Sequence, residues 1–215
     1  MASSSTGPVQ VVGSLTEARA AMDAGCDFIV AQGTEAGGHV RGQLNLLPLL
    51  DVVLDGVDLP VVAAGGIGTA QTMAAALAAG ASAVRVGTRF VATHESNAHP
   101  AYVDALVRAR AGDTVLTGAF SVMWPDAPHR VLRSCVEAAQ AVTDDIVGEM
   151  PMGALRMPVP KFSVSPPSRG TTGTIEAMAL YAGESVGSVT AVVSAGEVVR
   201  EMAEGAKRLL SATLS

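Results

Sequence analysis

The sequence contains little cysteine, little aromatic side chain and little charge. Two cysteines occur in 215 residues, aromatic residues make up 3% and charged residues 16%. Cys26 and Cys135 provide neither a disulfide framework nor the C-x-x-C spacing of a redox motif, so we expect both to act as small hydrophobic residues in a reducing, cytoplasmic compartment. Alanine and β-branched residues must fill the core in place of aromatic rings.

A basic surface is missing as well. The formal net charge is −6, and a protein that binds a phosphate backbone needs an excess of Lys and Arg on one face. We therefore expect no nucleic-acid partner. The 49% of hydrophobic residues indicate a chain with a buried core instead of a disordered one.

One long stretch carries no charge, from Leu59 to Val84, and it is long enough to cross a membrane. A proline and several glycines divide it into pieces of strand and helix length, so we predict buried elements and no membrane partner. The start of the chain, MASSSTGP, lacks the basic and apolar regions of a signal peptide. We predict a disordered lead-in over residues 1–8.

The first half repeats one unit, in which a short apolar run ends at glycine and a helical pattern follows. Such apolar runs occur at Val9–Val12, Asp27–Gln32, the VVAAGG after Pro60, and Ser82–Val86, and helical patterns at 14–25, 46–57 and 70–79. Alternating strands and helices predict an α/β fold with a parallel sheet. A doubly wound sheet and a (β/α)₈ barrel both remain open, and both place ligands at the carboxyl ends of the strands.

Beyond Thr93 the strand signal fades. We predict that residues 96–215 are a mainly helical part of the same domain as the βα units of residues 9–95. The expected helices are Pro100–Arg110, Val131–Val147, Glu176–Ala182 and Glu197–Leu210. Residues 150–173 hold five of the eleven prolines, which predicts an irregular segment that covers a site.

The stretch AQGTEAGGHVRG, Ala31 to Gly42, surrounds one histidine with glycines. It follows a predicted strand, so it lies on the face where ligands bind. His39 is therefore either a structural residue of a glycine-rich turn or a group presented to a ligand.

Two further dipeptides with glycine, Gly65-Gly66 and Gly87-Thr88, stand where neighbouring strands end. Glycine lets backbone amides approach a phosphate. Together they favour a phosphate site. The spacing of His94 and His99 is not that of a helical metal pair, so we expect a solvated loop or a helix start there and no metal site. His129 allows no interpretation from its sequence context.

Several of these motifs together resemble the nitronate monooxygenase family, also called 2-nitropropane dioxygenases. The matching stretches are AQGTEAGGHVRG, PVVAAGGI, VRVGTRFVATHES with AHPAY, and IEAMALYAGESVG. The resemblance implies an FMN-dependent (β/α)₈ barrel that oxidises alkyl nitronates or nitroalkanes with O₂ to a carbonyl compound and nitrite.

The resemblance also implies roles for individual residues. His39 stands at the position of the catalytic histidine, which acts as a base toward the nitroalkane carbon. The remaining matches are cofactor-binding positions. They are Gln32 and Gly37 at the flavin, Gly65 and Gly66 at the first phosphate loop, and Arg85, Val86, Gly87 and Thr88 at the second.

The sequence departs from the family pattern in three places. Arg85 replaces a glutamine or asparagine, and AFSVMWPDAPHRVLR replaces the usual Gly-Arg-Pro-Ala-Arg stretch. The opening strand of the family has no counterpart, so Val9–Val12 would be its fifth strand and only about four strands of the barrel are expected. Four strands cannot close a barrel, which leaves three explanations: a truncated product, a completing partner chain, or a homodimer.

Two other functions stay open at this stage. One is a non-catalytic half-barrel module that binds phosphate or flavin. The other is an NAD(P)H-dependent flavin reductase of the same barrel type.

Overall fold

The computed structural model describes residues 7–213, which fall into two compact units. The parallel-sheet unit comprises residues 7–35, 40–86 and 202–213, and the antiparallel unit comprises residues 36–39 and 87–201. Most of the predicted lead-in, residues 1–6, lies outside the described part. The prediction of one domain for 9–215 stays a prediction.

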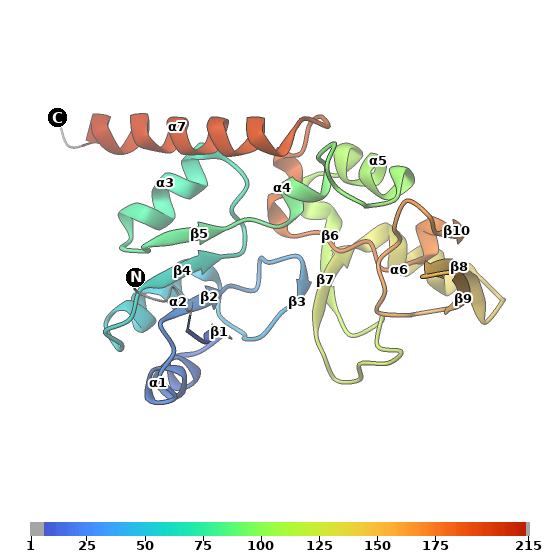
Figure 1. Ribbon diagram of the computed structural model, residues 1–215, viewed down its shortest axis with the longest axis horizontal. Coiled ribbons are helices and arrows are strands. Elements are labelled where there is room, and N and C mark those ends of the chain that lie inside the picture. The colour runs from blue at the N-terminus through green and yellow to red at the C-terminus, as the bar shows by residue number, and fades with distance from the viewer. Residues whose placement is uncertain (1–6, 214–215) are drawn as a thin grey trace. The chain divides into compact units, whose positions relative to one another are not determined.

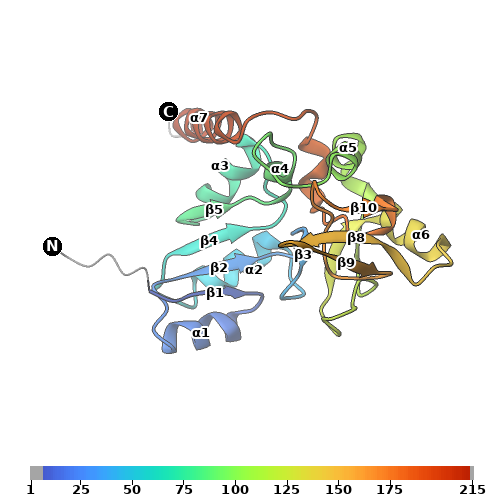
Figure 2. The same ribbon diagram turned by 45° about the vertical axis from the view of Figure 1, so that its right-hand side comes forward.

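Four parallel strands form the sheet of the first unit (Figure 1). They are β1 (Val9–Val12), β2 (Phe28–Gln32), β4 (Val61–Ala64) and β5 (Ala83–Arg85), in the order β1-β2-β4-β5. Both views show the strands as neighbouring arrows (Figure 2). The predicted strands are confirmed, and the sheet is open because β1 and β5 each pair on one side with a strand of this sheet.

The helices of this unit begin at predictable caps. In α1 (Leu15–Asp23) the Ser14 side chain accepts a hydrogen bond from the Glu17 amide at 3.2 Å, and in α3 (Ala70–Ala78) Thr69 and Thr72 form a capping box. The helix between them, α2, spans Leu46–Leu54. Leu49, Leu50 and Val53 of this helix are fully buried, because apolar residues at this spacing share one helix face.

The second unit contains two antiparallel sheets. One has the order β3-β7-β6, with β3 (Gly38–His39), β6 (Thr114–Thr117) and β7 (His129–Leu132). The other has the order β10-β8-β9, with β8 (Ile146–Met152), β9 (Leu155–Pro160) and β10 (Thr172–Gly173). Its helices are α4 (Thr88–Val91), α5 (Pro100–Arg108) and α6 (Arg133–Ala141), with 3-10 turns at Ala111–Asp113, Ile175–Ala177 and Glu184–Ser188.

These strands correct the prediction of a mainly helical second half. Of the helix expected over Val131–Val147, only α6 is helical, because its flanks form strands: β7 pairs with β3 and β6, and β8 pairs with β9 and β10. Of the helix expected over Glu176–Ala182, only a 3-10 turn at Ile175–Ala177 forms. The predicted helix over Glu197–Leu210 is confirmed within α7, Ala195–Thr213.

The proline-rich segment 150–173 is also more regular than predicted. Met152 pairs with Leu155 at the end of the β8–β9 hairpin, and Gly153 of its turn has a φ of 62°. Glycine adopts this conformation at no steric cost. Hairpin pairing therefore overrides the proline signal, and the predicted irregular segment holds β9 and β10.

The core of the antiparallel unit forms around Phe120, Leu106, Val131 and Cys135, all fully buried. Burial raises the pKa of the Cys135 thiol to about 12. This agrees with the expectation of an inert, hydrophobic cysteine. Within residues 7–213, the helices are too short or too polar for a membrane crossing.

Replacing Leu50 by alanine should lower the free energy of unfolding by about 2–5 kcal/mol, because a cavity would open in a fully buried position. The matched control on the same helix is Leu47→Ala, whose side chain is 57% exposed and should cost about 0.5 kcal/mol or less. Urea unfolding of both variants measures the difference. Equal losses would contradict the described packing of α2.

Candidate functional site

His39 lies on a two-residue strand that is held by a strand from far along the chain. In β3, Gly38 pairs with Arg130 and His39 with His129 of β7. Gly38 has a φ of 81°, a left-handed conformation that an L-residue with a Cβ atom rarely adopts. The glycine before the histidine is thus required by the turn that brings the imidazole into this sheet.

Three rings surround the imidazole of His39. Trp124 stacks on it with ring centroids 4.1 Å apart and an interplanar angle of 24°. The His129 ring lies edge-on at 5.5 Å, and the Tyr181 ring is tilted at 5.7 Å. Burial lowers the pKa of His39. His39 is therefore held in the neutral form that can accept a proton.

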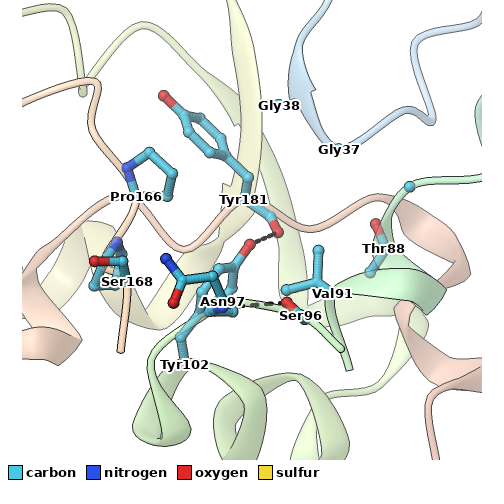
Figure 3. A pocket seen from close by; sticks show the side chains of 13 residues that line it. Gly37, Gly38, Thr88, Val91, Ser96, Asn97, Tyr102, Pro166, Ser168 and Tyr181 are labelled. Atoms are coloured by element: carbon cyan, nitrogen blue, oxygen red, sulfur yellow. Dashed lines mark hydrogen bonds between the residues drawn. The ribbon is translucent and has the colours of Figure 1, made fainter. Parts of the chain in front are cut away.

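A cavity of about 460 Å³ lies within the antiparallel unit (Figure 3). Its lining residues come from the segment before His39, from α4 and the residues that flank it, from the proline-rich segment, and from two tyrosines. They are Gly37, Gly38, Gly87, Thr88, Val91, Ser96, Asn97, Ala98, Tyr102, Pro166, Pro167, Ser168 and Tyr181. His39 adjoins this cavity through Gly38 and the Tyr181 ring.

Both tyrosines of the cavity wall donate hydrogen bonds from their hydroxyl groups to backbone carbonyls. The Tyr102 hydroxyl donates to the backbone carbonyl of Tyr181, as Figure 3 shows, and the Tyr181 hydroxyl donates to the Val164 carbonyl at 2.7 Å. Burial raises the pKa of Tyr181 to about 12 and that of Tyr102 above its ordinary value. Both are neutral wall residues at physiological pH.

The glycines of this cavity have different structural reasons. A Cβ atom at Gly37 would lie 2.5 Å from the Gly183 nitrogen, so the fold itself requires glycine there. At Gly87 a Cβ atom would meet nothing within 4 Å, and its φ of −111° suits any residue. Thr88 is buried, and its hydroxyl accepts from the Gly183 amide at 2.9 Å.

The parallel-sheet unit holds the other predicted cofactor positions at one edge of its sheet. Gln32 is in register with Ala64, and Ala64 with Arg85, so the carboxyl ends of these strands coincide. Gly65 and Gly66 follow with φ values of 109° and 68°. The Gln32 side-chain oxygen accepts from the Arg41 amide at 2.9 Å, and Arg85, the last residue of β5, is exposed.

The structure thus groups the predicted residues into two sets. Gly37, Gly87 and Thr88 line the cavity beside His39. Gln32, Gly65, Gly66, Arg85 and Val86 lie in the parallel-sheet unit, at or just after the ends of its strands. Their roles at a cofactor stay predictions.

Sequence reasoning missed Trp124, Tyr102, Tyr181 and the placement of His129. For Trp124 and His129 the signal was the WPDAPH departure from the family pattern. Tyr102 and Tyr181 lie in the matching stretches AHPAY and IEAMALYAGESVG. The expectation for the remaining histidines agrees with the structure, because His94 is exposed and His99 caps α5 by accepting from the Ala101 amide at 3.1 Å.

Comparison with known proteins agrees with this architecture. The sequence model of the nitronate monooxygenase family matches residues 4–205. Rv1533 of Mycobacterium tuberculosis, which carries the name of a monooxygenase, is 35% identical over 198 residues, covering 90% of this chain and 51% of that protein. A Staphylococcus aureus protein named probable nitronate monooxygenase is 41% identical over 126 residues, covering 53% of this chain and 35% of its own length.

Solved structures show the same relation. FabK from Thermotoga maritima aligns with a TM-score of 0.74 at 30% identity, covering 95% of this chain and 62% of FabK. Nitroalkane oxidase from Streptomyces ansochromogenes aligns with a TM-score of 0.70 at 29% identity, covering 95% of this chain and 58% of the oxidase. The predicted α/β fold class is confirmed.

The glycine-rich loops after parallel strands, together with the family match, define the class of this protein as a βα protein with a histidine on a short strand after a glycine-rich turn. The chain belongs to the nitronate monooxygenase family. It spans about half the length of Rv1533 and a smaller share of the staphylococcal relative.

His39 should lose its proton at a lower pH than an ordinary histidine, because burial disfavours the imidazolium form. An NMR titration of the imidazole signals measures this, with His39→Gln to assign the peak. Since the unfolded chain then binds the proton more tightly, the contribution of His39 to stability is present above the ordinary pKa and is lost as the pH falls through the folded-state pKa. A midpoint at or above that of free histidine would contradict the described burial.

Proposed function

We propose that this chain carries out the FMN-dependent oxidation of alkyl nitronates and nitroalkanes by O₂ to a carbonyl compound and nitrite. The observation that carries the proposal is the placement of His39, a histidine held neutral beside a cavity that is lined by Gly37, Gly87 and Thr88. The family of the chain and its similarity to nitroalkane oxidase support the same reaction.

The residues present fit a flavin phosphate. Gly87 lines the cavity and has no close neighbour around the position of a Cβ atom, so its backbone is open to the approach of a phosphate. Within the antiparallel unit, Gly87 and Thr88 would hold the phosphate, and Gly37 would contact the rest of FMN. Bound FMN would supply the redox chemistry, and the protein supplies position and electrostatics.

The chain's own residues have two tasks in this reaction. A ring nitrogen of His39 accepts the proton from the α-carbon of a nitroalkane, which leaves the nitronate anion beside the imidazolium. Val91, Pro166 and Pro167 present apolar surface in the cavity for an alkyl group. Two nitronate anions and one O₂ would together give two carbonyl compounds and two nitrite ions. Each α-carbon gains one oxygen atom and releases nitrite as its C–N bond breaks.

A second candidate is an NAD(P)H-dependent flavin reductase, which the similarity to FabK favours. A third is a non-catalytic flavin- or phosphate-binding module, because the chain covers only part of its relatives. The electron donor separates the first two candidates. A reductase would bleach the flavin rapidly with NADH in the absence of O₂, and a binding module would take up FMN without turnover.

The purified chain mixed with FMN should turn yellow, retain the flavin through gel filtration, and consume O₂ when propyl-2-nitronate is added. An oxygen electrode and a colorimetric nitrite assay measure turnover. A chain that never takes up flavin would overturn the proposal.

His39→Gln should keep FMN but lower turnover of neutral 2-nitropropane by about 10²–10⁴-fold, because no base remains to remove the α-proton. Turnover of preformed nitronate should fall less, since that substrate has already lost its proton. His94→Gln, at an exposed histidine that does not line the cavity, is the control. Unchanged nitroalkane turnover in His39→Gln would show that His39 is not the base.

Gly87→Ala should weaken FMN binding about tenfold or more, which corresponds to roughly 1.4 kcal/mol, because its methyl group would occupy the space of the phosphate. Thermal unfolding of the flavin-free chain should stay nearly unchanged, since that space is open in the fold. Gly112→Ala, which also meets nothing within 4 Å, should leave both properties as they are. Fluorescence titration with FMN measures the affinity, and equal affinity in all three chains would remove Gly87 from the phosphate site.

A further inference from the structure

The loop that precedes β7 is closed by the side chain of a buried histidine. His129 is fully buried, and its Nε2 atom accepts a hydrogen bond from the Phe120 amide at 3.1 Å. Its Nδ1 atom lies 2.9 Å from the Ala127 carbonyl oxygen. Since a carbonyl can only accept, Nδ1 carries the proton and donates it, and one neutral tautomer of His129 joins both ends of the loop 120–127.

The segment inside this closure is held in an unusual backbone conformation. Met123 has a φ of 75° and Asp126 a φ of 57°, values that cost free energy in residues other than glycine. Two backbone bonds keep the segment in place, from the Val122 amide to the Phe162 carbonyl at 3.1 Å and from the Trp124 amide to the Ser121 carbonyl at 3.0 Å.

Trp124 is the residue that this loop presents. Its side chain is 54% exposed, so it contributes little to the core, and its ring stacks at 4.1 Å on the imidazole of His39. A stacked indole covers one face of the imidazole and limits its rotation.

We propose that Trp124 is a positioning residue for His39, and that His129 acts through it by fixing the loop that brings the indole onto the imidazole. The catalytic part of this proposal rests on the proposed function. The stacking itself does not, because it can be measured without turnover.

The sequence provides its own probe, since Trp124 is the single tryptophan. Protonated imidazole quenches indole fluorescence more strongly than neutral imidazole, so emission of the full chain should fall on acidification with a midpoint below that of free histidine. The titratable rings that face His39 are His129 and Tyr181. Next to His129 on β7, Arg130 carries a positive charge. Its Nη2 atom forms an ion pair with the Glu184 Oε1 atom at 3.1 Å.

Four variants assign this signal. His39→Ala should abolish the transition and raise emission at low pH, while Met123→Leu, at a 72% exposed neighbour of Trp124, should leave it intact. His129→Phe, which removes both loop bonds, should remove most of the transition and increase quenching of Trp124 by acrylamide. His129→Gln keeps an acceptor for the Phe120 amide, so it should restore part of the transition if His129→Phe does not fold.

Kinetics complete the test in the FMN-loaded chain. Trp124→Leu should lower kcat for 2-nitropropane about tenfold, with a smaller change in KM and in FMN uptake, and Trp124→Phe should recover most of the loss. Emission that is independent of pH, or a transition that survives His39→Ala, would overturn the proposal even if nitronate turnover is normal. A normal fluorescence transition in a chain without turnover would uphold the stacking and refute the proposed function.

Discussion

The pairing of β3 with β7 is the constraint on which the rest of the site depends. Two residues, Gly38 and His39, pair with Arg130 and His129, and this short ladder determines what surrounds the imidazole. It places His39 opposite a buried histidine, beside the Tyr181 ring, and within reach of the loop that ends at β7. The positive φ of Gly38 makes the ladder sterically accessible, so a glycine fixes the position of the candidate base.

The strands of the parallel-sheet unit could be predicted because their information is local. A buried parallel strand can be predicted from an apolar run that ends at glycine and is followed by a capped helix. The partner strand does not have to be known. The strands of the antiparallel unit lack such local information. In β7 the sequence His129–Leu132 resembles the beginning of the helix that follows it, and only pairing with β3 and β6 makes it extended.

The candidate site was predictable to a similar extent. Glycine next to a strand end is a local signal, so Gly65, Gly66 and Gly87 could be singled out, and a histidine among glycines drew attention to His39. Trp124 carries no signal of this kind, because its side chain stacks on a ring from a segment far along the chain. Its sequence context departs from the family pattern, and in the structure this departure places an indole ring on the imidazole of His39.

The burial of the Cys135 thiol protects this side chain from oxidation. Thiolate, and not thiol, reacts with peroxides, and a cysteine whose pKa lies near 12 carries almost no thiolate at neutral pH. Its Sγ atom also contacts the Leu132 carbonyl at 3.0 Å at the start of α6. The protein can therefore keep a sulfur atom in its core without exposing it to slow oxidation.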